Sequence, residues 1–338
     1  GTTARLLLGL LAAHPFEARL TGDKSLRRRP MGRVTEPLGR MGAKFAPTGA
    51  STLPLSVRGG KLAALRWDLP VSSAQIKGSL LFAGMAGGVE VSLREPGGLS
   101  RDHTERLLRG FGFRVEERGG RIELAPGGRV EPFEIQVPGD PSSAAFLVGA
   151  GVLAEGGALA IAGVGVNPTR TGFLRVLERM GARVSVTDEV ASFGEPVGTI
   201  HAAPGSLAAV DVAAAEIPGL VDEVPLLAVL AARARGTTIF REVGELRVKE
   251  SDRLALIAGN LRAVGVSAEV VGSDLHVEGG EAPPRGRVRT DGDHRLAMAF
   301  AVLGTVKGAR ITIDDPDCAD VSFPGFAAAL RAVRRRAS

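Results

Sequence analysis

A pattern of about 70 residues recurs along the chain, and this period is much longer than that of a solenoid repeat. Each copy begins with a short polar cluster, followed by an apolar segment that is typical of a buried helix. We identify five copies, whose polar clusters are Gly1-Thr2-Thr3, Ser72-Ser73, Ser142-Ser143, Asp222-Glu223 and Asp293-His294-Arg295. A repeat of this kind predicts an α/β protein assembled from similar units of helices and strands.

Each copy continues with a short strand, a charged loop and an amphipathic second helix. We expect the second helix to stop at a glycine, because glycine adopts the left-handed conformation of a helix C-cap without steric cost. The expected stops are Gly42, Gly112, Gly181 and Gly265. The apolar first helices should be buried and the second helices half exposed, with the sheets on the outside.

The length of 338 residues, with 44% hydrophobic residues, is sufficient for two domains. Three units would fill a domain, so five units indicate a sixth that is incomplete. The chain begins at a polar cluster without a preceding strand, and we therefore expect an amino-terminal segment to be missing. The stretch Val137-Pro138-Gly139-Asp140 is the candidate hinge, which gives predicted domains 1–138 and 139–338.

Composition excludes several classes of function. The net charge of +5 comes from scattered arginines, and a chain with no tyrosine and one tryptophan offers no base-stacking platform, so nucleic acid is not a predicted partner. The single cysteine, Cys318, excludes an intrachain disulfide and favours the cytoplasm. Glu155-Gly156-Gly157 interrupts the most apolar region, so no membrane segment is predicted. Cysteine and histidine show no metal-ligand spacing.

The polar helix starts predict an anionic ligand. Backbone N–H groups of a first turn and the helix dipole both favour negative charge. If several units direct these ends into one cleft, they form a site for phosphate and carboxylate groups.

Eight segments make the prediction more specific, because they occur together and in order. They are residues 1–5 (GTTAR), 29–31 (RPM), 73–75 (SAQ), 100–105 (SRDHTE), 222–223 (DE), 247–253 (RVKESDR), 293–295 (DHR) and 322–324 (SFP). In this order and at this spacing the sequence resembles the 5-enolpyruvylshikimate-3-phosphate synthases over essentially its whole length.

The resemblance implies a fold and a reaction. The fold is the two-domain enolpyruvyl transferase fold, an inverse α/β barrel of βαβαββ units, of which five of six would be present. The reaction transfers the enolpyruvyl group of phosphoenolpyruvate to the 5-hydroxyl of shikimate 3-phosphate and releases phosphate, in aromatic amino acid biosynthesis. The resemblance also implies a monomer without metal or cofactor. Gly1, where alanine could stand, suggests that the inhibitor glyphosate can enter.

The resemblance also assigns site residues. Shikimate 3-phosphate would be held by Ser73, Ala74, Gln75, Ser100, Arg101, Asp222 and Lys249. Phosphoenolpyruvate would be held by Gly1, Arg29, Gln75, Arg253 and Arg295, since guanidinium groups match carboxylate and phosphate oxygens bidentately. The catalytic residues would be Asp222, which accepts the hydroxyl proton, Glu250, which protonates the methylene carbon, and Lys249, which neutralises charge.

Simpler interpretations compete with these assignments. Lys249 and Glu250 would ordinarily form a solvated face, and Asp222-Glu223 could merely cap a helix. We expect Ser142 and Ser143 only to cap the helix that they begin. We also expect Arg253→Ala to abolish phosphoenolpyruvate binding with little effect on stability.

Departures from the family leave rival functions open. Val321 stands where some members place a lysine, and the family's first lysine, serine and arginine are missing, so we expect negligible turnover from this chain alone. The rivals are a UDP-N-acetylglucosamine enolpyruvyl transferase, and a non-catalytic remnant or inactive fragment of the same fold.

Overall fold

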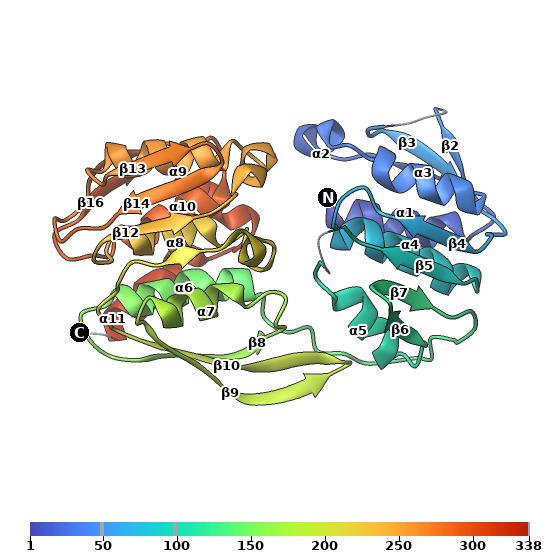
Figure 1. Ribbon diagram of the computed structural model, residues 1–338, viewed down its shortest axis with the longest axis horizontal. Helices are drawn as coiled ribbons and strands as arrows, with labels where there is room; N and C mark the ends of the chain where they lie inside the picture. The colour runs from blue at the N-terminus through green and yellow to red at the C-terminus, as the bar shows by residue number, and fades with distance from the viewer. Residues whose placement is uncertain (48–50, 97–99, 337–338) are drawn as a thin grey trace. The chain divides into compact units, whose positions relative to one another are not determined.

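The computed structural model describes residues 1–47, 51–96 and 100–336 (Figure 1). The chain divides into two compact units. The first comprises Gly1–Gln136 with Ser192–Glu195, and the second comprises Val137–Ala191 with Pro196–Ser338. The second unit therefore begins at Val137 instead of Gly139, and a short turn from the later sequence joins the first unit. No helix in the described ranges is long and apolar enough to cross a membrane.

The first unit contains two sheets and five helices among its described residues. One sheet has the order β1-β3-β2, and the other has the order β4-β5-β7-β6. The strands are β1 (Glu17–Leu20), β2 (Lys44–Ala46), β3 (Leu55–Arg58), β4 (Leu65–Asp68), β5 (Val91–Arg94), β6 (Val115–Arg118) and β7 (Arg121–Leu124). The helices are α1 (Thr2–Ala12), α2 (Lys24–Arg28), α3 (Gly32–Met41), α4 (Ala74–Gly87) and α5 (His103–Gly110).

The second unit contains the remaining elements. Its strands are β8 (Leu159–Gly165), β9 (Arg183–Ser192), β10 (Glu195–Ala203), β11 (Asp211–Val212), β12 (Thr237–Phe240), β13 (Ala268–Val271), β14 (Asp274–Glu278), β15 (Arg285–Val288) and β16 (Arg310–Ile313). Its α-helices are α6 (Pro141–Leu153), α7 (Gly172–Arg179), α8 (Val224–Ala231), α9 (Arg253–Ala263), α10 (His294–Leu303) and α11 (Phe326–Arg336). Short 3₁₀ helices are η1 (Ala214–Gly219), η2 (Gly244–Val248) and η3 (Pro316–Val321).

The sheets repeat one topology, which confirms the predicted repeating unit. In both β4-β5-β7-β6 and β11-β12-β14-β13, the first two strands are parallel and the later neighbours are antiparallel. The sheet β8-β10-β9 keeps this order, but its first strand is reduced to an isolated parallel bridge between Gly139 and Val164. Parallel strands need a crossover connection, and the first helix of each unit supplies it.

The first helices of the second unit are buried, as the sequence predicts, whereas α1 buries only four of its eleven residues. All eight residues of α8 are buried, and α6, α8 and α10 contact one another inside the second unit (Figure 1). In the first unit α1 packs on α4 so closely that a Cβ on Gly9 would come within 1.9 Å of the Ser79 carbonyl oxygen. These contacts fix the positions of the amino termini of the first helices, where the polar clusters lie.

The glycine stops of the second helices are also confirmed. Gly42, Gly112, Gly181 and Gly265 have φ angles of 119°, 83°, 86° and 89°. A residue with a side chain adopts such angles only with strain.

The turn at residues 192–195 contacts the rest of the first unit through the Phe193 ring, the Gly194 carbonyl oxygen and the Glu195 carboxylate. The Phe193 ring centroid lies 5.5 Å from that of Phe111 and 5.8 Å from that of Phe133. Glu195 Oε1 lies 2.8 Å from Nδ1 of His103.

Candidate active site

Asp222 and Glu223 precede α8, and neither side chain caps it. Glu223 occupies the N-cap position without a side-chain capping hydrogen bond. Asp222 Oδ1 instead lies 3.6 Å from Arg253 Nη1. The interpretation of this pair as a mere helix cap is therefore wrong, because both carboxylates interact with other side chains.

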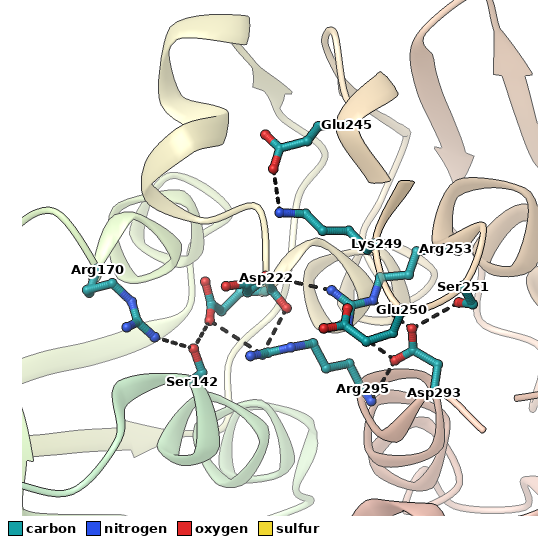
Figure 2. Close-up of polar contacts among 11 residues, drawn as sticks. Ser142, Arg170, Asp222, Glu245, Lys249, Glu250, Ser251, Arg253, Asp293 and Arg295 are labelled. Atoms are coloured by element: carbon teal, nitrogen blue, oxygen red, sulfur yellow. Dashed lines mark hydrogen bonds and ion pairs between the residues drawn. The ribbon is translucent and has the colours of Figure 1, made fainter. Parts of the chain in front are cut away.

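Arg253 is the centre of a group of carboxylates (Figure 2). It begins α9, and only 1% of its side chain is exposed. Its Nε lies 2.7 Å from Asp293 Oδ2, and its Nη2 lies 2.6 Å from Glu250 Oε2. A buried cation is tolerated only with such partners, because removing one partner leaves an uncompensated charge. Burial of Arg253 therefore argues against the expectation that its removal would leave stability unchanged.

Asp293 connects the 247–253 segment to α10. Its Oδ1 accepts a hydrogen bond from the Arg295 backbone N–H at 3.0 Å, which caps α10. Its Oδ2 accepts a hydrogen bond from Ser251 Oγ at 2.9 Å and one from Arg253. One buried carboxylate thus fixes two of the predicted arginines relative to each other.

Lys249 and Glu250 differ from Arg253 in remaining partly exposed. Lys249 Nζ donates to the Glu245 carboxylate, and 22% of the lysine side chain is exposed. The exposed fraction of the Glu250 side chain is 35%. Both side chains can therefore meet a ligand without unfolding, as proton transfer requires.

Arg295 lies beside the start of α8. Its Nη1 donates to the Asp222 carbonyl oxygen at 3.2 Å and lies 3.9 Å from Glu223 Oε1. Asp222 therefore contacts Arg253 through its side chain and Arg295 through its backbone. The five predicted residues of the second unit, Asp222, Lys249, Glu250, Arg253 and Arg295, form one neighbourhood (Figure 2).

Ser142 belongs to this neighbourhood, contrary to expectation. Asp140, and not Ser142, caps α6, by accepting the Ser143 N–H at 2.9 Å. Ser142 Oγ donates to Glu223 Oε1 and accepts a hydrogen bond from Arg170 Nη2 at 2.6 Å. These contacts could not be predicted from the sequence, because serine at a helix start is usually explained by capping alone.

Burial shifts the pKa values of two side chains in this neighbourhood, Glu223 and His294. The pKa of Glu223 is raised, chiefly because burial disfavours the carboxylate and also because Asp222 is negative, although Arg295 opposes the shift. The pKa of His294 is lowered, first by burial and then by the charge of Arg295. The lowered pKa favours the neutral form of His294 beside the charged Arg295.

The first unit brings other predicted residues together around Gln75. The Gln75 side chain donates to Thr2 Oγ1 at 2.8 Å and accepts from Arg5 Nη1. Arg5 Nη2 also donates to the Pro30 carbonyl oxygen at 3.0 Å. A Cβ on Gly1 would lie 2.9 Å from Arg29 Nη1, so the guanidinium packs directly against this glycine. Arg5 lies in segment 1–5, which carries the family resemblance, but no role was predicted for it.

Ser73 and Ser100 are joined by a residue that the sequence did not single out. Ser73 Oγ accepts from the Ile76 N–H at 3.5 Å and caps α4, whose first residue is Ala74. The Ser73 N–H and Ser100 Oγ both donate to Glu95 Oε1, at 2.8 and 2.7 Å. Arg101 is half-buried and follows Ser100 directly, before the start of α5.

Comparison with known proteins decides the family. The model of the EPSP synthase (3-phosphoshikimate 1-carboxyvinyltransferase) family matches residues 1–330. The chain belongs to the EPSP synthase family. It is 47% identical to the 3-phosphoshikimate 1-carboxyvinyltransferase of Desulforudis audaxviator over 335 residues, which covers 99% of this chain and 78% of that protein. Its counterpart from Acidiphilium cryptum is also 47% identical, over 98% of this chain and 76% of its own length.

Solved structures agree with this assignment to the EPSP synthases. The EPSP synthase from Acinetobacter baumannii has a TM-score of 0.90 and 39% identity, over 99% of this chain and 77% of its own length. The enolpyruvyl transferase NikO from Streptomyces tendae, with a TM-score of 0.74 and 21% identity, shares the fold. The predicted enolpyruvyl transferase fold and the predicted transferase class are therefore confirmed, and the rival functions are not favoured.

Proposed function

We propose that this chain transfers the enolpyruvyl group from phosphoenolpyruvate to the 5-hydroxyl of shikimate 3-phosphate, using the two residue groups described above. The observation that carries the proposal is Arg253, a buried cation in contact with Asp222, Glu250 and Asp293. Two carboxylates that share one arginine are held close together, and an addition followed by an elimination needs two proton-transfer groups.

The proposed reaction begins at the hydroxyl. Asp222 accepts the proton of the 5-hydroxyl while the oxygen attacks the enol carbon of phosphoenolpyruvate, and Glu250 delivers a proton to the methylene carbon. This gives a tetrahedral ketal phosphate. Glu250 then removes a proton from the resulting methyl group, and the carbon–oxygen bond to phosphate breaks with its electron pair leaving on the phosphate. The enol ether is released together with inorganic phosphate, which takes up the proton held by Asp222.

The positive residues supply electrostatic stabilisation. Phosphoenolpyruvate carries a carboxylate and a phosphate, so it requires several fixed cations, and Arg29, Arg253 and Arg295 fill this role. Gln75 contacts both substrates, and Gly1 leaves room for the approach of phosphoenolpyruvate. Shikimate 3-phosphate binds Ser73, Ala74, Ser100, Arg101 and Lys249. The proposal includes a monomeric cytoplasmic enzyme that glyphosate inhibits and that works without metal or cofactor.

Phosphate release tests the proposal. Purified protein is mixed with both substrates, with each substrate alone, and with the Lys249→Met variant. Because the family assignment favours the enzyme over an inactive fragment, we expect phosphate release from this chain, in place of the negligible turnover expected from the sequence. The release should require both substrates and fall at least about 100-fold in the variant. The matched control is Lys307→Met, because Lys307 is 81% exposed and pairs with the surface residue Glu155. Failure of the protein to bind either substrate in calorimetry would contradict the proposal.

A further inference from the structure

We infer that Glu95 is a positioning residue for shikimate 3-phosphate, because it joins the segments that carry Ser73 and Ser100. The inference rests on the proposed function, since that function places the phosphorylated substrate at these serines. Glu95 is not among the residues that the family resemblance assigns.

Each carboxylate oxygen of Glu95 accepts two hydrogen bonds. The residue follows β5 and is 6% exposed. Oε1 accepts the Ser73 N–H at 2.8 Å and the Ser100 hydroxyl at 2.7 Å. Oε2 accepts the Ser100 N–H at 2.9 Å and Lys77 Nζ at 3.0 Å. Four donors from three residues therefore converge on one buried carboxylate, which fixes their relative positions.

Lys77 makes this arrangement possible inside the protein. It lies on α4, its side chain is wholly buried, and it forms ion pairs with Glu95 at 3.0 Å and Glu105 at 2.7 Å. Lys77 Nζ also donates to the Ser100 carbonyl oxygen at 3.3 Å. Ser100 is thus held through its N–H, its carbonyl and its hydroxyl, all by the Glu95–Lys77 pair.

The direction of the two serine hydroxyls follows from these contacts. Because Ser100 Oγ donates its proton to Glu95, it offers lone pairs to a ligand and would accept a hydrogen bond from a hydroxyl of the substrate. Ser73 Oγ accepts from the Ile76 N–H, so its own proton stays available for a phosphate oxygen. Glu95 thereby makes Ser100 an acceptor towards the substrate, while the helix cap leaves Ser73 a donor.

In this inference Glu95 supports the two serines and does not itself contact the phosphate of the substrate. A carboxylate that touched the phosphate would repel it. Because Glu95 is buried and ion-paired with Lys77, it can orient donors without itself contacting the substrate. Misplacement of a binding group by 1 Å can cost about 100-fold in rate, so loss of this support should be measurable.

The test uses Glu95→Gln and Glu95→Asp in the whole chain. Glutamine keeps the size but places an amide donor opposite other donors, and aspartate keeps the charge for Lys77 but shortens the reach. We expect both variants to bind shikimate 3-phosphate at least about 10-fold more weakly in calorimetry. We also expect the amide NMR signals of Ser73 and Ser100 to move, while those of α9 in the other unit stay in place.

The control is Glu90→Gln, an exposed carboxylate just before the other end of β5, which should behave as wild type. Unchanged affinity in a folded Glu95→Gln or Glu95→Asp protein would overturn the inference. If the wild-type protein failed to bind shikimate 3-phosphate, the proposed function would fail instead. The NMR signals would still report whether Glu95 holds the two segments, so the two failures are distinguishable.

Discussion

Arg253 and Asp293, 40 residues apart in the sequence, form a buried ion pair with Nε 2.7 Å from Oδ2. Neither charge is exposed by more than about 1%, and each has further partners, which for Asp293 include Ser251 and the start of α10. The pair connects two segments that carry proposed site residues. Its energetic importance can be measured by removing one charge.

Replacement of Asp293 by asparagine should destabilise the protein by about 3–5 kcal/mol, because Arg253 would remain buried without its principal counter-charge. Urea unfolding followed by far-ultraviolet circular dichroism measures this loss. The control is Glu36→Gln, which breaks a surface pair with Arg40 whose side chains are both 62% exposed, and which should cost less than about 1 kcal/mol. Equal effects of the two substitutions would contradict the interpretation.

Two glycines of the α3 region should respond to alanine in opposite directions. Gly39 is exposed within the helix, and a Cβ there would meet nothing within 4 Å, so Gly39→Ala should stabilise by about 0.5–1 kcal/mol. Gly42 has a φ angle of 119°, so Gly42→Ala should destabilise by about 1–2 kcal/mol. Midpoints of urea unfolding compare the two variants, and a shift in the same direction for both would refute the assigned C-cap.

The buried Glu223 carboxyl group should make the free energy of unfolding fall as pH rises. Since burial raises its pKa in the folded protein, the folded state retains a proton that the unfolded state has already released. The free energy of unfolding therefore falls from about pH 4.5, the ordinary glutamate range, up to the raised pKa. Glu223→Gln should remove this fall. Unfolding measured from pH 4.5 to 7 tests the difference between the two proteins, and parallel pH profiles would exclude the expected contribution.

Glu250→Gln should reduce turnover much more than binding. The amide cannot deliver or remove a proton, and loss of a general acid–base group typically lowers rates about 10²–10⁴-fold. Substrate dissociation constants should change by less than about threefold, since the site retains its arginines. The control is Glu269→Gln, an exposed position on β13. A large loss of affinity with unchanged turnover would assign Glu250 to binding instead.

The sequence predicted local features better than long-range pairs. The glycine stops were correct because a left-handed C-cap depends on one residue, and the repeat was recognisable because each unit uses the same order of polar and apolar segments. Ser142 was misjudged because its partner Glu223 lies 81 residues away. Glu95 was missed for a related reason, since only the fold brings Ser73, Lys77 and Ser100 around one carboxylate.

Asp222 and Glu223 are neighbours in the chain, yet their side chains lie beside different arginines, Arg253 and Arg295. A shift of the backbone by one position at the start of α8 would exchange the two carboxylates and put the longer, buried one in place of the proposed proton acceptor. The wholly buried helix that follows resists such a shift, because sliding it would move all eight of its packed side chains out of their places. Close packing of the apolar interior therefore sets which carboxylate stands at the position of the proposed proton acceptor.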